Sequence, residues 1–295
     1  MMIKILLKIR NWFNLFGKSI SSIFRIVLMS KSVNTFKNTK PASKALIILG
    51  NGPGLKPFIE ESRNKLSKYE LLCVNHFGIT DYYTELKPKY YVAIAFDLFR
   101  DDIMPHFVEA SNKLFNAIAD KTDWPLKFFI TVEAKKHERW QKILSQNKHI
   151  EIIYINLTPV EGFHKFMYRN FDKAKGMPRP HNVMVPAIYT AISLKAPKII
   201  LAGADHSWLK ELHVDDDNRT LFYNQHFYDK EKQVKQFDYA GQRYMKLHEI
   251  LGTMSLAFKS YHILKEYAEY KNIKILNITQ GSYIDAFDRC KYEDL

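Results

Sequence analysis

The sequence predicts an α/β protein with a Rossmann-like, mostly parallel sheet and helices on both faces of that sheet. Short apolar runs alternate with helical stretches from residue 44 onward, which is the pattern of repeated strand–helix units. Polar residues follow several of these runs, at the positions where the strands of such a sheet end. With 46% hydrophobic and 25% charged residues among 295, the composition is that of a soluble globular protein.

The expected elements follow one another along residues 44–295, which we interpret as one catalytic domain. Within it, a stretch over about 206–245 fits neither helix nor strand periodicity and is rich in histidine and tyrosine, which is typical of a lid or substrate loop. The expected strands are 44–50, 70–75, 89–96, 126–132, 150–156, 198–205 and 273–279, and the expected helices are 57–69, 105–120, 136–147, 181–196 and 260–272.

Residues 1–29 are expected to form an amphipathic helix on a membrane surface, joined to the domain by a polar linker over 30–43. On a helical wheel, basic side chains fall on one side of 3–29 and apolar, partly aromatic ones on the other, which suits an anionic bilayer surface. Packing on the protein's own core or on a partner is the alternative. The charges interrupt every stretch of about 18 residues, so neither a spanning helix nor a secretory signal is expected. The polar side holds Lys4, Lys8, Asn11, Lys18, Ser22 and Arg25, and the apolar side holds Ile5, Ile9, Trp12, Phe13, Phe16, Ile20, Ile23 and Val27.

The positive charge is concentrated at the N-terminus. Residues 1–40 carry eight Lys or Arg and no acid, whereas the other 255 residues carry 36 basic and 31 acidic side chains, a balance of only +5. A nucleic-acid partner is therefore not expected, because it would need a basic face on the folded domain. Two cysteines without a disulfide or zinc pattern favour a reducing compartment.

Four expected strand ends carry the candidate binding residues. The segment "GNGPGL" follows the first strand, and its residues Gly50, Asn51, Gly52 and Pro53 would bring backbone N–H groups close to an anionic ligand ahead of a helix. The other three ends supply Asn75, Asp97, and Asp205 with His206. The glycine spacing fits neither the dinucleotide fingerprint nor the phosphate loop of nucleoside triphosphatases.

Together, "GNGPGL" and "CVNHF" resemble the start of the small bacterial sialyltransferases that modify lipooligosaccharides. The segments "AISLKAPKIILAGAD" and "IKILNITQGSYIDAF" are similar to later parts of that family, so the resemblance covers about 44–110 and 180–290. The same glycine loop and G-x-D pattern also resemble the 6-hydroxymethylpterin diphosphokinase-like (MptE-like) proteins, which have a related core.

The sialyltransferase resemblance implies inverting transfer from a CMP-sugar, with no metal and no other cofactor required. It places the donor against Asn51, Gly52 and Asn75, and the cytidine end against Ser282. It implies a histidine as the base that takes the acceptor proton, and counting back from the last strand indicates His248; His213 and His226 in the lid are alternatives. Lid tyrosines would support the departing phosphate, and the candidates are Tyr223, Tyr228 and Tyr239.

Two departures from the sialyltransferase pattern keep a metal-dependent reaction open. Asp97 stands where the family has an asparagine, and the lid contains Asp215, Asp216 and Asp217. Under the MptE-like alternative, Asp97, Asp205 and His213 would serve a diphosphate transfer from ATP with Mg²⁺; otherwise Asp215–Asp217 form a solvated turn.

One further segment, "RPHN", stands at an expected helix start beside the strand ends. Arg179 in it is a candidate contact for a sugar carboxylate or a phosphate. Asn182 is a candidate contact too, or merely caps the helix.

These observations favour a glycosyltransferase that works on a lipid-borne or surface glycan. We expect it to be peripheral on the inner face of a bacterial cytoplasmic membrane and to use a nucleotide-sugar donor. The candidate catalytic residues are His248, His213, Tyr228 and Asp205. A Mg²⁺-dependent diphosphokinase is the second hypothesis. A non-catalytic nucleotide-binding protein of envelope assembly is the third, although so many titratable lid residues are unusual for a binding module.

Overall fold

The computed structural model describes residues 2–33, 36, 42–224, 227–228, 233–236, 238–239 and 243–294. An eight-stranded sheet lies at its centre, and all seven pairings within the sheet are parallel. The strand order is β13-β12-β6-β1-β2-β3-β4-β5. This confirms the predicted α/β, Rossmann-like fold. The strands are β1 (Leu46–Leu49), β2 (Glu70–Val74), β3 (Tyr90–Ala93), β4 (Leu126–Thr131), β5 (Ile150–Ile155), β6 (Lys198–Ala202), β12 (Lys274–Asn277) and β13 (Asp288–Arg289).

Alternation along the strands builds one hydrophobic core on each face of the sheet. In β1, Leu46 and Ile48 point into one core, and Ile47 and Leu49 into the other, because successive side chains of a strand point to opposite faces. Strands buried on both faces explain why the sequence runs are apolar throughout rather than alternating. The first core is covered by α7 (His164–Asp172), α8 (Met184–Ser193) and α9 (Leu247–Tyr270); the second by α2 (Leu55–Leu66), α3 (Asp81–Leu86), α4 (Phe96–Phe99), α5 (Pro105–Lys121) and α6 (Glu138–Leu144).

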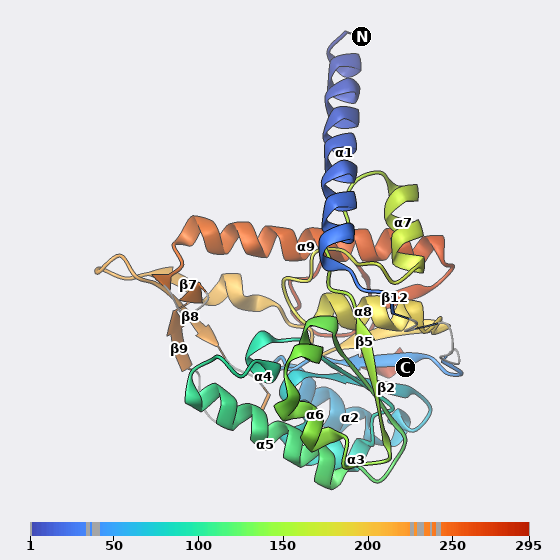
Figure 1. Ribbon diagram of the computed structural model, residues 1–295, viewed down its shortest axis with the longest axis vertical. Coiled ribbons are helices and arrows are strands. Elements are labelled where there is room, and N and C mark those ends of the chain that lie inside the picture. The colour runs from blue at the N-terminus through green and yellow to red at the C-terminus, as the bar shows by residue number, and fades with distance from the viewer. Residues whose placement is uncertain are drawn as a thin grey trace.

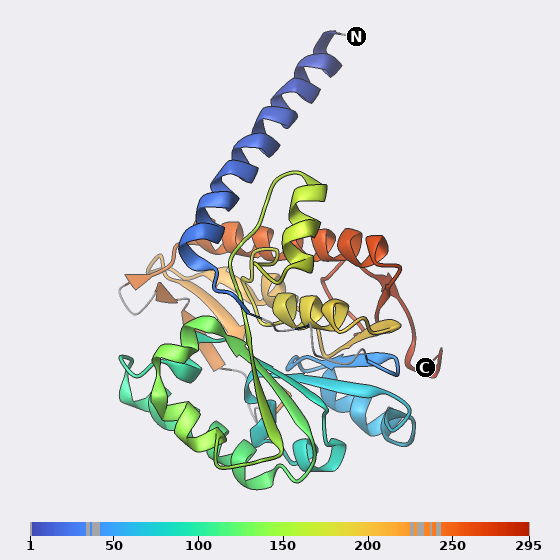
Figure 2. The same cartoon turned by 45° about the vertical axis from the view of Figure 1, so that its right-hand side comes forward.

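The expected N-terminal helix is present as α1 (Met2–Met29). Figures 1 and 2 show it rising from the body, with its first half clear of the rest of the chain and α7 beside its second half. Within the described residues, no helix combines the length and the apolarity that crossing a bilayer requires.

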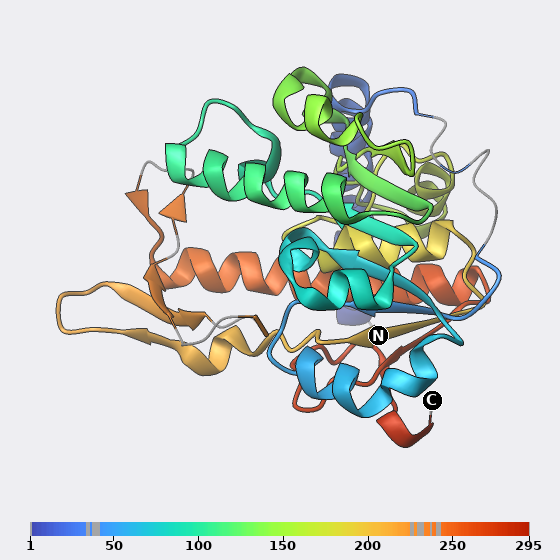
Figure 3. The same ribbon diagram turned by 90° about the horizontal axis from the view of Figure 1, so that it is seen from below.

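The region expected to be an irregular lid contains short antiparallel strands. β7 (Leu212–Val214), β8 (Thr220–Asn224) and β9 (Gln233–Gln236) form one small sheet, and β10 (Asp238–Tyr239) pairs with β11 (Arg243–Tyr244). Figures 1 and 3 place this region at the end of the molecule where both α5 and α9 begin. Strands this short, with mixed polar and aromatic side chains, leave too weak a pattern for periodicity to detect.

Four helices differ from the sequence prediction. The last long helix, α9, begins at Leu247 rather than near residue 260, so His248 lies in its first turn and not in a loop ahead of it. The short helices α3, α4 and α7 lie in stretches for which the sequence predicted no helix.

Candidate functional site

The chain order of the sheet places a topological switch point between β1 and β6. From β1 the chain moves outward through β2, β3, β4 and β5, and then returns to β6 on the other side of β1. The loops after β1 and β6 therefore leave in opposite directions, and ligands of open α/β sheets bind between such loops. We call the residues Gly50–Gly54 the glycine loop, and this loop together with Gly203–His206 the switch-point site.

The glycine loop packs directly against the loop after β6. The N–H of Gly50 donates to the Ala202 carbonyl at 2.7 Å, and the N–H of Gly52 donates to the Gly203 carbonyl at 2.9 Å. A Cβ on Gly52 would lie 1.9 Å from Oδ2 of Asp205 and 2.7 Å from the Gly203 oxygen. The glycines are thus needed for the close approach of two protein segments, as well as for any approach by a ligand.

The carboxylate of Asp205 occupies the position at the start of α2 where the sequence led us to expect a ligand's anion. The N–H of Gly54 donates to both of its oxygens, at 3.1 and 3.3 Å. Burial raises the pKa of Asp205 to about 6, against the opposing effect of the Gly54 hydrogen bond. A ligand phosphate at this loop would have to share the N–H groups with this carboxylate.

Asn51 joins the glycine loop to the neighbouring strand end and to the lid. Its Nδ2 donates to the Val74 carbonyl at 3.1 Å, and its own carbonyl accepts from the N–H of Phe227 at 3.1 Å. The Phe227 ring also contacts the ring of Phe77, with the centroids 5.8 Å apart, and the ring of Tyr228, one of the lid tyrosines proposed as a site residue. Residues 227–228 of the lid therefore lie over the loops after β1 and β2.

Asn75 is held in an unusual backbone conformation at the end of β2. Its φ is +44°, and its carbonyl accepts a hydrogen bond from the hydroxyl of Tyr91, which in turn accepts the N–H of Gly78 at 2.9 Å. A non-glycine residue in this region is uncommon and points to a local constraint. The side-chain Oδ1 is buried and has no hydrogen-bond partner in the described part of the chain.

Asn182 accepts hydrogen bonds at the start of α8, which is one of the two roles that the sequence left open; its contact with a ligand stays a prediction. Its Oδ1 accepts the first N–H groups of α8, from Met184 at 2.9 Å and Val185 at 3.3 Å, and also the hydroxyl of Tyr261 at 2.9 Å. Backbone N–H groups can donate only to oxygen, so they fix which end of the amide is Nδ2. That Nδ2 is buried, and none of the described residues accepts its hydrogen bonds.

Tyr261 connects Asn182 to His206, the residue that follows Asp205 at the strand end and for which the sequence suggested no role. The Tyr261 oxygen lies 2.5 Å from Nε2 of His206. The imidazole of His206 is buried, and the backbone φ of this residue is +51°. If Tyr261 gives its proton to Asn182, it must accept from Nε2–H, which leaves Nδ1 as the acceptor of a neutral ring. Burial lowers the pKa of His206 to about 3, so the ring is neutral at pH 7.

Ser282 lies on the far wall of the switch-point site, where it braces the backbone. Its hydroxyl donates to the Ala204 carbonyl at 2.6 Å and accepts from Nδ2 of Asn277 at 3.0 Å. The next residue, Tyr283, donates its N–H to the Asp205 carbonyl at 2.8 Å. The proton of Ser282 is thus used within the protein, and its contact with a nucleotide stays a prediction.

The predicted catalytic histidines lie outside this hydrogen-bonded group. His248 is exposed in the first turn of α9, and His213 is exposed on β7, where its Nδ1 lies 3.4 Å from the Glu211 carbonyl. Tyr223 and Tyr239 lie on β8 and β10, and His226 falls outside the described residues. Among the lid candidates in the described part of the chain, Tyr228 lies next to the glycine loop, through Phe227.

The acidic residues considered for a metal are not brought together. Asp97 lies in the first turn of α4 after β3, whereas Asp205 is engaged at the glycine loop. Asp215 accepts the N–H groups of Asp217 and Arg219, at 3.1 and 2.8 Å, as in a solvated turn. Among the residues whose placement is described, no group of three or more His, Cys, Asp and Glu is arranged to hold a metal ion.

Arg179 is directed away from the switch-point site. Its Nε and Nη2 donate to Oε2 of Glu161, at 2.9 and 2.6 Å, and Arg25 of α1 donates to the same oxygen at 3.2 Å. The structure therefore places Arg179 at the junction between α1 and the body.

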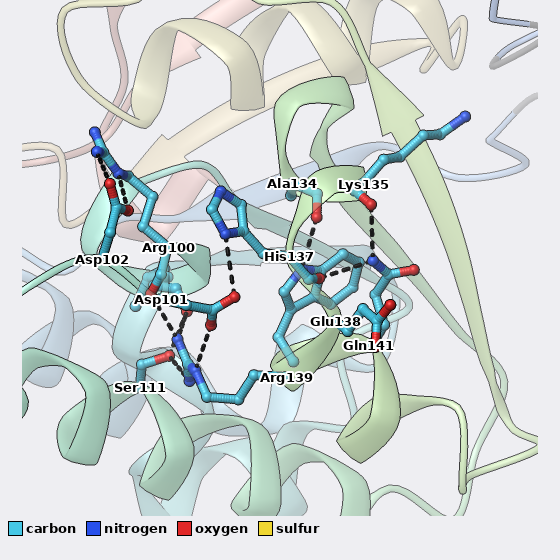
Figure 4. A network of polar contacts seen from close by, with 12 residues as sticks. Arg100, Asp101, Asp102, Ser111, Ala134, Lys135, His137, Glu138, Arg139 and Gln141 are labelled. Atoms are coloured by element: carbon cyan, nitrogen blue, oxygen red, sulfur yellow. Dashed lines mark hydrogen bonds and ion pairs between the residues drawn. The ribbon is translucent and has the colours of Figure 1, made fainter.

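A histidine–aspartate pair lies at the ends of β3 and β4, on the same edge of the sheet (Figure 4). Nδ1 of His137 lies 3.2 Å from Oδ2 of Asp101, and Nε of Arg139 donates to the other carboxylate oxygen at 3.0 Å. The other imidazole nitrogen points away from Asp101. This pair could not be predicted from the sequence, because its members are 36 positions apart and belong to no motif.

One cavity, of about 670 Å³, lies at the opposite edge of the sheet, near the ends of α7 and α8. Three of its charged or polar lining residues pair with one another: Asp172 accepts from Tyr267 at 2.7 Å and from Lys271 at 2.8 Å. We therefore do not treat it as the functional site.

No protein-family model and no curated protein sequence matches this chain. Among solved structures, the chain is similar to the MAf glycosyltransferase from Magnetospirillum magneticum AMB-1, with a TM-score of 0.47 and 9% sequence identity. The match covers 96% of this chain and 39% of that one, so the chain spans about two-fifths of the length of that glycosyltransferase. A likeness this distant carries no argument about the reaction.

Proposed function

We propose that the protein is a glycosyltransferase that binds a nucleotide-activated sugar at the switch-point site. The observation that carries the proposal is a pair of buried amide atoms, Oδ1 of Asn75 and Nδ2 of Asn182, that have no partner in the described chain. Buried polar groups in native proteins are nearly always hydrogen-bonded, and each exception needs an explanation. A polar ligand that brings both donors and acceptors explains the two together.

The chemistry of the two atoms fits the two ends of such a donor. The oxygen of Asn75 would accept from an amino group of the base or from a ribose or sugar hydroxyl. The Nδ2 of Asn182 would donate to a phosphate or carboxylate oxygen. A CMP-linked sugar has all of these groups, and the likeness of "GNGPGL" and the G-x-D segment to sialyltransferases favours it among nucleotide sugars.

In the transfer step, the acceptor hydroxyl oxygen forms a bond to the anomeric carbon while the bond from that carbon to the donor phosphate oxygen breaks. The nucleotide leaves with the electron pair, and a base takes the hydroxyl proton. Inversion follows from a single displacement. The acceptor we propose is a lipid-borne or surface glycan at the inner face of the cytoplasmic membrane, which α1 would bring within reach.

Nucleotide binding is tested by thermal shift of the full chain with CMP, UDP, ATP and GDP, with and without Mg²⁺. We expect CMP to raise the melting temperature without metal, and Asn182→Asp to lose that shift. The aspartate keeps an oxygen for the α8 N–H groups, so the unliganded protein should melt as before; Asn112→Asp on α5 serves as the control. ATP stabilisation that requires Mg²⁺ would instead support the diphosphokinase, and no shift with any nucleotide would refute both.

The identity of the base is tested by comparing His248→Ala and His137→Ala. The family resemblance predicts that His248→Ala abolishes transfer and spares the CMP thermal shift. His137 is the competing candidate, because its ring is oriented by Asp101 as the ring of a general base would be. Loss of transfer in His137→Ala with full activity in His248→Ala would overturn the assignment; His213→Ala decides the case in which both retain activity.

A further inference from the structure

The side of α1 that contacts the body is its polar side. The hydroxyl of Ser22 donates to the Glu161 carbonyl and accepts the Glu161 N–H, both at 2.9 Å, and the hydroxyl of Ser19 accepts the N–H of Phe163 at 3.2 Å. Gly162 lies between these two contacts, and a Cβ there would lie 2.0 Å from the Ser19 hydroxyl. The body thus binds the face of α1 that would ordinarily be solvated.

Most of the apolar side of α1 is consequently turned away from the body, although Trp12 contacts Phe163, with the ring centroids 5.9 Å apart, and Ile26 packs on the core. Large apolar side chains are exposed in both halves of the helix; for example, the exposed fraction is 48% for Ile9 and 74% for Val27. Trp12 and Phe16 stack with their centroids 5.3 Å apart on this exposed side. These exposed side chains do not pack on the protein's own core, which was the alternative raised by the sequence. The exposed large apolar residues of α1 are Met2, Ile3, Ile5, Leu6, Leu7, Ile9, Trp12, Phe13, Phe16, Ile20, Ile23, Phe24, Val27, Leu28 and Met29.

Four cations gather where α1 meets the body, and we call Lys18, Arg25, Arg179 and Lys259 the basic cluster. The only acid that pairs with them in the described chain is Glu161, which binds both arginines. Burial, followed by repulsion from Lys259, lowers the pKa of Lys18. Cations that repel one another beside a single carboxylate leave room for a further anion.

We propose that α1 docks the protein on an anionic bilayer, with its exposed apolar face at the acyl boundary and the basic cluster against lipid headgroup phosphates. This deepens the membrane part of the proposed function. A helix with this distribution of side chains lies in the plane of the interface, where aromatic and aliphatic side chains enter the acyl boundary. Lysines and arginines beside it gain attraction from the negative surface potential.

Charge decides between a bilayer and a second copy of the helix as the occupant of this face. α1 carries five Lys or Arg and no Asp or Glu. A second α1 would add five more cations to the contact without supplying one acid, whereas anionic headgroups supply the missing charge.

The apolar contact is tested by sedimentation of the full-length protein with phosphatidylglycerol vesicles. We expect Ile9→Glu to weaken binding about tenfold or more, because it places a charge in the acyl boundary. The matched control is Leu251→Glu on α9, which changes a leucine of similar exposure, 42%, and should bind as wild type. Wild-type protein that stays in the supernatant, or Ile9→Glu that binds like wild type, would overturn the proposal.

The basic cluster is tested in the same assay with Lys18→Ala and Lys259→Ala. Each should weaken binding to phosphatidylglycerol about fivefold and leave binding to phosphatidylcholine unchanged, as expected for one lysine near an anionic surface. Lys142→Ala on α6 is the control. Equal loss of binding to both lipids would refute a headgroup role for the cluster.

Two further readouts separate this proposal from others. Analytical ultracentrifugation without lipid should give the same mass for wild type and Ile9→Glu; a wild-type dimer that the variant dissociates would assign the face to a second copy. The CMP thermal shift should persist in every α1 variant, so a failure of membrane binding and a failure of the transferase proposal give different results.

Discussion

The switch-point site and α1 differ in how closely their functional residues are tied to the fold. At the switch point, the atoms facing a ligand also hold the protein together: the N–H of Gly52 binds Gly203, and the carboxylate of Asp205 binds Gly54. On α1, the hydrogen bonds to the body come from the polar side, and most of the apolar side is exposed along the helix. The switch-point residues are therefore part of the packing of the domain, whereas the outer face of α1 is not.

The difference sets what each region can report when it is changed. A substitution at the switch point alters stability and binding at once, so loss of activity there says little without a stability measurement. A substitution on the outer face of α1 leaves the folded contacts intact, so loss of membrane binding can be assigned to that face alone. The predictions that follow test this contrast.

The largest effect is expected from Gly52→Ala. The added Cβ would lie 2.7 Å from the Gly203 oxygen, which is fixed by its hydrogen bond to the N–H of residue 52, so the backbone itself must move. We expect the free energy of unfolding to fall by about 3 kcal/mol, as measured by urea denaturation.

The comparison for that variant is Gly17→Ala on α1. Gly17 lies in mid-helix, and nothing stands within 4 Å of the position of its Cβ. Alanine there should leave the core transition unchanged and raise helix content, because glycine costs about 0.5–1 kcal/mol relative to alanine inside a helix. Equal destabilisation by both substitutions would remove the contrast between the two regions.

The sequence predicts the fold well because one local signal, an apolar run of strand length, recurs at every buried strand. It also predicts that Asn75, Asp205 and Asn182 lie near the ends of these strands. What it does not predict is which of these atoms the protein uses for itself. Asp205 binds an N–H 151 positions away, and no local pattern encodes such a contact.

The same limit applies to α1 and to the lid. A helical wheel divides α1 correctly into two faces, but it does not say which face the body binds, because that depends on Glu161, far along the chain. Arg179 looked available for a ligand for the same reason: its partner is a distant glutamate. The His137–Asp101 pair was not predicted, because each residue, taken alone in the sequence, is typical of the protein surface.

A smaller effect, and one that depends on pH, is expected from Asp205→Asn. The pKa of Asp205 is about 6 in the folded protein, above its ordinary value of 3.8, so the folded state binds the proton more tightly than the unfolded chain. The free energy of unfolding therefore falls as the pH rises from about 4 to 6 and stays lower above it. Asparagine does not ionise, and its oxygen can still accept the Gly54 N–H. The variant should be more stable than wild type by about 2 kcal/mol at pH 7–8, and equally stable near pH 4.

The control for Asp205→Asn is Asp123→Asn, at an exposed carboxylate whose pKa is lowered by its hydrogen bond to Lys87. There the sign is opposite, so asparagine should give no gain at pH 8. Urea unfolding of both variants at pH 4 and pH 8 makes the comparison. If Asp205→Asn gains stability and loses transferase activity, the buried carboxylate is required for function although it lowers the stability of the fold. If its stability falls at pH 8, the carboxylate is a structural brace like Ser282, and the functional part of the site shrinks to the two asparagines.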